Sequence, residues 1–325
     1  MRVVRVGVIG CGTIARAVHL PVLLRTARVA VAALADPDPT ALETAGRATP
    51  GAALCRDAGG LLARDDLDAV VVTAPSGHHA ALALAVAGSG RHLYLEKPLA
   101  TTRADGEAVV EAAKTAGIVA AIGFNRRFHP AILRARSVVR AGGIGRVTNV
   151  RATFTEPTGE QPAWKLARAG GGGALLDLAS HHVDLVRFLL DTEVEEIAAT
   201  VTSRQSEHDD AILRLRLAGG AEAELEVGFR APKADTIELT GSLGAIRVDR
   251  HAGRVTKRPG RLAPNGALGL LRLRLLVRPE SDPSYALALR AFVACVRGED
   301  VELPTLEDGL ASLAVVLAAE ETAAS

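Results

Sequence analysis

The N-terminal residues combine a strand-like run with a glycine-rich turn. Residues 3–9 are rich in β-branched side chains, and Gly10-Cys11-Gly12-Thr13-Ile14-Ala15 follows them directly. A helical pattern then begins, and this order is the context that a dinucleotide-binding fingerprint requires. Gly10 would permit the tight turn, Gly12 would let the backbone approach a pyrophosphate, and Ala15 is small enough for close helix–strand packing. In isolation, the pattern also fits an ordinary turn between a strand and a helix.

Asp36 ends the next β-rich run, residues 29–35. It stands about 20 residues beyond the glycine turn, where an acidic side chain accepts hydrogen bonds from a ribose diol. The alternative is that Asp36 caps the helix expected from Pro37 onward. Together with the glycine turn, Asp36 indicates a dinucleotide cofactor. Because a carboxylate would repel a 2′-phosphate, it favours NAD, and NADP is retained as the alternative.

Strand-like and helical patterns continue to alternate up to residue 124. Further strands are expected at residues 52–55, 69–73, 93–95 and 118–122. This alternation predicts an α/β fold with a doubly wound parallel sheet, in which ligands bind at the carboxyl ends of the strands. The candidate cofactor-binding residues lie at these ends and on the glycine turn: Gly10, Gly12, Thr13, Ile14, Ala15, Asp36, Thr73, Ala74, Pro75, His79, Glu96, Lys97 and Asn125.

The strand at residues 93–95 ends abruptly in Glu96-Lys97-Pro98. Pro98 cannot continue a helix and disfavours α geometry at Lys97, so the lysine is held at a defined exit from the strand. A charged pair beside a proline is also common in surface turns. Because other candidate residues fall at neighbouring strand ends, we interpret Lys97 as part of a site.

From about residue 126 the pattern changes. Strand-like segments are expected at residues 147–154, 194–201, 211–217, 221–229, 236–239 and 245–248, and helices at 128–140, 174–190, 284–297 and 306–321. Most of these strands follow one another without a helix between them, which predicts a largely antiparallel, open-faced sheet. Residues 250–283 show no assignable pattern. We therefore expect a dinucleotide-binding domain at residues 1–124 and an α/β domain for substrate binding and oligomerisation at 125–325, with the last helix a candidate to pack back on the first domain.

The helix expected at residues 174–190 carries Asp177, His181 and Asp184, spaced so that they project from one face. A carboxylate four residues before an imidazole can orient the ring and support its positive form, which suits a general base. The alternatives are a solvated helix pair and part of a metal site. No third metal ligand is evident from the spacing, so we expect no metal. We interpret the glycines at 170–173 as a flexible lead-in to the helix rather than a phosphate cradle.

Composition argues against several classes of protein. The 325 residues carry a formal net charge of +1, and the basic clusters lack interleaved aromatic side chains, so we expect no nucleic-acid partner. Cys11, Cys55 and Cys295 are few and far apart, which fits unpaired thiols in a reducing compartment. We see neither an apolar segment near the roughly 20 residues that span a bilayer nor a signal-peptide layout. We expect a cytoplasmic protein without a membrane partner.

Several motifs together resemble the Gfo/Idh/MocA oxidoreductase family, typified by glucose–fructose oxidoreductase and inositol dehydrogenase. The more specific of them are Glu96-Lys97-Pro98 and Gly171-Gly172-Gly173 followed by Asp177 and His181. The fingerprint at residues 10–15, Pro75-Ser76 with His79, and Gly123-Phe124-Asn125-Arg126-Arg127-Phe128 also look like family signatures. The resemblance covers residues 3–229 and resumes weakly at 285–325.

The resemblance implies a Rossmann domain and a second domain whose sheet family members often use to assemble, so a homodimer or homotetramer is expected. It also implies that Lys97 and His181 flank the reacting carbinol carbon and that Asp177 belongs to the same polar cluster. Trp164 and Arg127 are further candidate substrate-binding residues. The family often has an arginine after this tryptophan; Lys165, which stands here, lacks the planar fork of donors that arginine offers to a carboxylate or phosphate.

We therefore expect an NAD(P)-dependent dehydrogenase or reductase acting on a secondary alcohol or ketone of a sugar, cyclitol or sugar derivative. His181 would act as acid and base, Lys97 would stabilise the reacting oxygen, and Asp177 would orient or charge-balance the pair. One alternative is a ketoreductase that uses NADPH on a nucleotide-activated sugar. Another is a non-catalytic NAD(P)-binding sensor or regulator. A third is an enzyme that keeps its cofactor tightly bound and recycles it through a second substrate.

Overall fold

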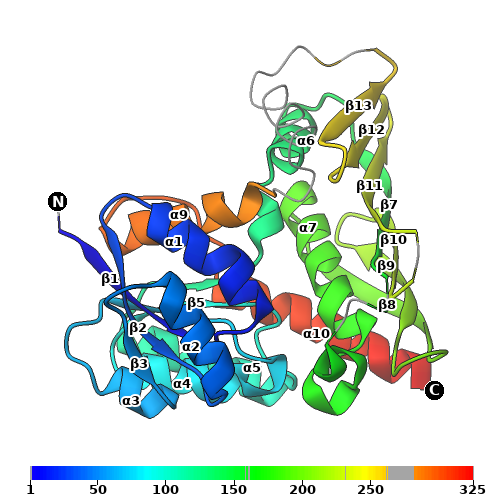
Figure 1. Ribbon diagram of the computed structural model, residues 1–325. Coiled ribbons are helices and arrows are strands. Elements are labelled where there is room, and N and C mark those ends of the chain that lie inside the picture. The colour runs from blue at the N-terminus through cyan, green and yellow to red at the C-terminus, as the bar shows by residue number, and fades with distance from the viewer. Residues whose placement is uncertain are drawn as a thin grey trace. The chain divides into compact units, whose positions relative to one another are not determined.

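The chain folds into two compact units (Figure 1). The computed structural model describes residues 2–157, 159, 162–230, 232–260, 262 and 282–324. The first unit comprises residues 1–124 and 285–313, and the second comprises residues 125–284 and 314–325. Residues 285–313 therefore belong with the first unit, whereas the sequence assigned all of 125–325 to a second domain. The boundary after Leu313 divides the last helix, α10 (Leu306–Ala324).

In the described part of the first unit, six parallel strands form one sheet in the order β3-β2-β1-β4-β5-β6. The strands are β1 (Val4–Ile9), β2 (Val29–Ala35), β3 (Ala53–Cys55), β4 (Ala69–Val72), β5 (His92–Leu95) and β6 (Ala120–Ile122). This is the strand order of a doubly wound sheet: β2 and β3 are added on one side of β1, and β4, β5 and β6 on the other, so the strand order switches between β1 and β4. The predicted parallel α/β fold is confirmed.

Helices cover both faces of this sheet. They are α1 (Leu20–Arg25), α2 (Pro39–Ala48), α3 (Ala58–Leu62), α4 (His79–Gly88), α5 (Arg103–Ala116) and α9 (Ser284–Val296), and a π-helical turn at Ala15–His19 precedes α1. Successive residues of a strand point to opposite faces. Val71 accordingly shares a core with residues of α1, α2 and α9, whereas Val70 shares one with residues of α3, α4 and α5. Leu289 and Phe292 of α9 are fully buried in the first of these cores, which explains why α9 belongs to this unit.

Among the described residues of the second unit, seven strands form a sheet in the order β13-β12-β11-β7-β10-β9-β8. They are β7 (Val147–Thr155), β8 (Val194–Thr202), β9 (Asp210–Leu217), β10 (Glu222–Gly228), β11 (Ala234–Gly241), β12 (Gly244–Asp249) and β13 (Arg254–Arg258). β7 and β10 run parallel and the other neighbours are antiparallel, so the prediction of a largely antiparallel sheet is confirmed. β13 lies in the stretch without an assignable pattern; residues 261 and 263–281 of that stretch lie outside the described residues.

Helices α6 (Pro130–Arg140) and α7 (Ser180–Leu190) pack on the sheet of the second unit (Figure 1). Along β10, Ala223 and Leu225 are buried, and the glutamates that alternate with them face the opposite side of the sheet. A π-helical turn at Leu175–Ala179 leads into α7, where the sequence predicted a regular helix. Within the described ranges, no helix combines the length and the apolar character needed to cross a membrane.

Candidate functional site

The turn after β1 is tightly packed at Gly10 and open at Gly12. Gly10 has a φ of +94°, and a Cβ placed there would lie 2.7 Å from the backbone nitrogen of Ala74. Glycine suits both this conformation and this close approach of two strand ends. By contrast, a Cβ on Gly12 would meet no atom within 4 Å. The backbone at Gly12 therefore borders space that a pyrophosphate can occupy, beside the first N–H groups of the following helix.

Asp36 lies at the end of β2 and binds the glycine turn. Its Oδ2 accepts a hydrogen bond from Cys11 N–H at 2.6 Å, and its Oδ1 accepts one from Asp38 N–H at 2.9 Å. The N-cap of α2 is Asp38, so helix capping is not the role of Asp36. Asp36 is half-buried, and its partner Cys11 directly precedes Gly12. Each carboxylate oxygen has a second lone pair that can accept a hydrogen bond from a ribose hydroxyl.

Hydrogen bonds join the end of β4 to the ends of its neighbours, β1 and β5. Thr73 Oγ1 donates a hydrogen bond to the carbonyl oxygen of Gly10 at 2.6 Å. The buried ring of His79 lies with Nδ1 2.6 Å from the carbonyl oxygen of Pro98 and Nε2 2.9 Å from that of Ala74. Burial lowers the pKa of His79, although both carbonyl oxygens favour its charged form. His79, a predicted cofactor ligand, thus has both ring nitrogens engaged in holding the ends of β4 and β5 together.

Glu96, at the end of β5, pairs with a histidine that the sequence did not single out. His19 Nε2 lies 2.8 Å from Glu96 Oε1, and the His19 side chain is fully buried. Burial alone would raise the pKa of Glu96, but the hydrogen bond and charge of His19 hold it below its usual value. Glu96 Oε2 also accepts from the backbone N–H of Lys97 at 3.2 Å. Glu96 is thus buried with both oxygens bonded inside the protein, and its predicted contact with a cofactor stays a prediction.

The structure brings the predicted cofactor-binding residues of the first unit to one edge of its sheet. Parallel strands present their carboxyl ends at the same edge, so the connections after β1, β2, β4 and β5 meet there. Lys97 leaves β5 half-buried at this edge. The residues grouped there are Gly10, Gly12, Thr13, Ile14, Ala15, Asp36, Thr73, Ala74, Pro75, His79, Glu96 and Lys97.

In the second unit, Asp177 pairs with Lys165. Lys165 Nζ lies 2.9 Å from Asp177 Oδ2, and their side chains are 24% and 4% exposed. Trp164, which precedes Lys165 on a short 3-10 turn (Ala163–Leu166), has its ring centroid 5.8 Å from that Nζ. His181 is buried, and its ring is edge-on to Phe154 with 6.4 Å between centroids. This unit therefore places Trp164, Lys165 and Asp177 in one cluster.

The glycine run at residues 170–173 packs against the backbone of the Trp164 loop. Gly173 N–H donates to the carbonyl oxygen of Lys165 at 2.7 Å. A Cβ on Gly172 would overlap that carbonyl group, and a Cβ on Gly170 would lie 2.9 Å from the carbonyl oxygen of Trp164. Gly170 and Gly172 therefore allow two segments to lie closer together than side chains would permit, a packing role that the interpretation as a flexible lead-in did not include.

Asn125 and Arg127 are buried and bonded within the second unit. Asn125 Nδ2 donates to Ser284 Oγ at 2.6 Å. Arg127 Nε donates to Asp184 Oδ2 at 2.9 Å, with both side chains almost fully buried. Asp177 and Asp184 thus have different cationic partners, although the sequence placed them on one helical face. The proposed contacts of Asn125 with a cofactor and of Arg127 with a substrate stay predictions.

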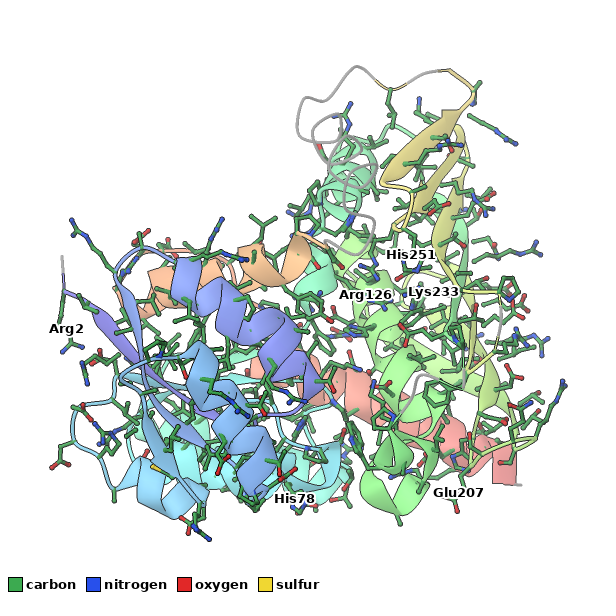
Figure 2. The ribbon with its side chains drawn as sticks, in the orientation of Figure 1. Arg2, His78, Arg126, Glu207, Lys233 and His251 are labelled. Carbon is green, nitrogen blue, oxygen red and sulfur yellow. The ribbon has the colours of Figure 1, made fainter. Side chains whose placement is uncertain are left out.

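A buried ion cluster lies beside α7. Asp235 Oδ2 forms ion pairs with Arg126 Nη1 at 3.2 Å and with Arg250 Nη2 at 2.6 Å (Arg126 is labelled in Figure 2). Burial would raise the pKa of Asp235, but the two guanidinium groups hold it well below its usual value. Burial lowers the pKa of His182 to about 3, so the neighbour of His181 is neutral. In the part of the chain that the structure describes, no three His, Cys, Asp or Glu side chains gather as a metal-binding group.

Comparisons with known proteins agree with this arrangement. Residues 4–124 match an oxidoreductase family with an NAD-binding Rossmann fold, and residues 132–247 match the GFO/IDH/MocA C-terminal domain. An inositol 2-dehydrogenase from Rhizobium meliloti is 29% identical over 99% of this chain and 97% of its own length. A 1,5-anhydro-D-fructose reductase from Ensifer adhaerens is 31% identical over 82% of this chain and 80% of its own length. The crystal structure of the WlbA dehydrogenase from Bordetella pertussis in complex with NADH and UDP-GlcNAcA has a TM-score of 0.86 at 26% identity, covering 99% of this chain and 96% of that one.

The first unit suits the cofactor that these matches imply. The open space at Gly12 suits a pyrophosphate, and the half-buried carboxylate of Asp36 suits a ribose diol. Both halves of the chain match the same oxidoreductase family, whose named members are dehydrogenases and reductases. The chain is an enzyme that belongs to the Gfo/Idh/MocA family of NAD-binding oxidoreductases.

Proposed function

We propose that the protein transfers hydride between NAD and a secondary alcohol of a sugar or cyclitol. The observation that carries the proposal is the strand-end edge of the first unit, where Gly12 and Asp36 suit the cofactor and Lys97 leaves β5. The substrate class comes from the relatives, which are named for inositol and for an anhydro sugar. Both are rings that carry several secondary hydroxyl groups.

The roles of the protein side chains follow from the charge changes of alcohol oxidation. When bound, NAD⁺ supplies the acceptor for the hydride that leaves the carbinol carbon. His181 takes the hydroxyl proton as the carbon–oxygen bond becomes a carbonyl, and it returns a proton in the reverse direction. The ammonium group of Lys97 donates a hydrogen bond to the same oxygen and stabilises its alkoxide character. Asp177 orients or charge-balances this pair.

We assign NAD rather than NADP as the working cofactor. Asp36 places a carboxylate at the end of β2, where the adenosine ribose binds in doubly wound folds. A 2′-phosphate there would meet a like charge, which costs several kcal/mol when it is not compensated. Cys11 and Asp38 donate backbone N–H groups to Asp36, which keeps its carboxylate in this place.

The test is the absorbance of reduced nicotinamide with NAD⁺ and NADP⁺ separately, against a panel of cyclitols, aldoses and sugar nucleotides. We expect signal with NAD⁺ and one polyol class. His181→Ala and Lys97→Ala should each lower turnover by about 10²–10⁴-fold, the usual contribution of a positioned acid–base group. If wild type is silent on the whole panel, the proposed function fails. If either variant stays within about 10²-fold of wild type, the residue roles fail.

A second candidate is a dehydrogenase or ketoreductase that acts on a nucleotide-activated sugar. It is favoured by the likeness to the WlbA dehydrogenase, whose crystal structure is a complex with NADH and UDP-GlcNAcA. The same residues would serve this reaction in either direction. Signal with the sugar nucleotides of the panel, and none with free polyols, would select this candidate.

We also propose that the protein assembles as a homodimer or homotetramer through the sheet of the second unit. The face of β9 and β10 opposite the buried residues carries cross-strand ion pairs such as Arg214 with Glu224. Sedimentation equilibrium would give the mass of the assembly. A monomer at micromolar concentration would contradict this part of the proposal.

A further inference from the structure

The loop that carries Trp164 and Lys165 is held on several sides within the second unit. The glycine run fixes its backbone, as described above. Arg168, at its far end, donates from its backbone N–H to Glu207 Oε2 at 2.5 Å and from Nε to Glu320 Oε1 at 2.6 Å (Glu207 is labelled in Figure 2). Glu207 N–H in turn donates to the carbonyl oxygen of Leu166 at 3.2 Å. These contacts hold the backbone of Lys165 in place independently of the contacts that its side chain makes.

From this fixed backbone, the Lys165 side chain reaches the almost fully buried carboxylate of Asp177. The Asp177 side chain is 4% exposed and lies 2.9 Å from Lys165 Nζ. An exposed ion pair contributes little, but removing one partner of a buried pair leaves the other charge less well compensated in a site that water hardly reaches. Loss of the Lys165 ammonium would therefore favour rotation of the Asp177 carboxylate or its protonation. The orientation and charge of Asp177 thus depend on Lys165.

We propose that Lys165 is a positioning residue for the reaction, acting by holding the Asp177 carboxylate in its working orientation. The inference rests on the proposed function, because it matters for turnover only if Asp177 takes part in the reaction. Lys165 acts through Asp177 and needs no contact with the reacting atoms. The close packing of Gly170 and Gly172 on this loop fits that role, because it fixes the backbone from which the Lys165 side chain extends. A bulkier residue there would displace the lysine from the carboxylate.

A double-mutant cycle with Lys165→Met and Asp177→Asn tests the proposal. Rates are measured with NAD⁺ and myo-inositol, or with whichever panel compound gives the highest rate. We expect Lys165→Met to lower kcat by about 10- to 100-fold, the scale of a misplaced catalytic group, while KM for NAD⁺ stays within twofold. If Lys165 acts only through Asp177, the double variant should be no slower than Asp177→Asn alone.

Matched controls separate positioning from a general loss of structure. Lys165→Arg keeps the charge and a donor and should recover kcat to within about threefold of wild type. Arg140→Met removes a positive charge from an exposed ion pair with Asp191, at the end of α6 in the same unit, and should leave kcat within twofold. Binding of NADH, followed by its fluorescence, should be unchanged in Lys165→Met. If that variant does not fold, Lys165→Gln, which keeps a donor without the charge, takes its place.

Failure of the inference and failure of the proposed function give different results. If Asp177→Asn is slow but Lys165→Met keeps wild-type kcat, Lys165 does not position Asp177 and the inference is overturned. The same holds if the two substitutions lower kcat additively in the cycle. If Asp177→Asn itself keeps wild-type kcat, the role of Asp177 in the proposed function fails, and the inference fails with it.

Discussion

His19 Nε2 lies 2.8 Å from Glu96 Oε1 and so joins the helix after the glycine turn to the end of β5. The His19 ring is also edge-on to Tyr94 and Tyr285, with centroids 5.9 and 6.0 Å away. A Cβ on Gly123 would lie 2.9 Å from Glu96 Oε2, so the end of β6 packs against the same carboxylate. Glu96 is therefore confined by neighbouring elements, which fixes where Lys97 leaves the strand.

Glu96→Gln should remove an acid-sensitive part of the stability. The pKa of Glu96 is held below its ordinary value of 4.5, so ionised Glu96 stabilises the fold above that pH, and this contribution is lost as the pH falls through the folded-state pKa. The free energy of unfolding of wild type should then fall more steeply below pH 4.5 than that of the variant. Urea titrations at neutral and acidic pH measure the difference.

The control for this substitution is Glu107→Gln, which removes a carboxylate from an exposed ion pair with Arg103. Exposed pairs contribute little, so its acid dependence should follow that of wild type. If Glu96→Gln behaves like this control, Glu96 is not stabilised as an ion in the folded protein.

Most of the fold could be predicted from local pattern. Each strand of the first unit is a short apolar run bounded by turn residues, and the order of strands and helices leaves few topologies for a parallel sheet. The sequence therefore predicted correctly where these strands end, and that Asp36 and Lys97 follow two of them. β13 was missed because Arg254–Arg258 holds a single apolar residue, Val255, among charged and polar ones, on a sheet edge where neither face needs a run of apolar residues.

The pairings inside the site could not be predicted, because they depend on contacts between distant residues. His19 stands four residues after Ala15 on the buried side of the helix, a signal that also fits a core residue; its partner is 77 residues away. Arg127 was predicted to bind substrate, and nothing local indicated its buried partner Asp184, which is 57 residues away. The glycines at 170–173 looked flexible because sequence does not reveal the returning loop that they accommodate.

Asp36→Asn should weaken the preference for NAD over NADP. The substitution removes the charge that would repel a 2′-phosphate and keeps an oxygen that can accept from Cys11 N–H. We expect the ratio of kcat/KM for NADP⁺ to that for NAD⁺ to rise roughly tenfold or more, since uncompensated like charges cost several kcal/mol. Steady-state rates with both cofactors measure it. An unchanged ratio would mean that Asp36 does not select the cofactor.

Gly172→Ala should lower turnover without touching any proposed catalytic group. Its methyl group would overlap the Lys165 carbonyl, so the loop and the Lys165 side chain must move. We expect kcat to fall by about tenfold or more, as for other misplaced site groups. Gly88→Ala, in α4, is the control, because its methyl group would meet no atom within 4 Å. Equal kcat values for the two variants would show that the close packing at Gly172 is not needed for turnover.

Asp235→Asn should destabilise the protein more than any surface charge change. Asp235 is 3% exposed and forms ion pairs with both Arg126 and Arg250, so its neutralisation removes a buried counter-ion that the two guanidinium groups share, although Arg250 keeps its ion pair with Asp282. Breaking a buried ion pair in this way costs about 3–5 kcal/mol. Glu238→Gln, on the same strand β11, removes the partner of the exposed Arg247 and should change the free energy of unfolding by no more than about 0.5 kcal/mol. Urea unfolding at neutral pH compares the two variants. Equal losses of unfolding free energy would show that water reaches the ion cluster and screens its charges.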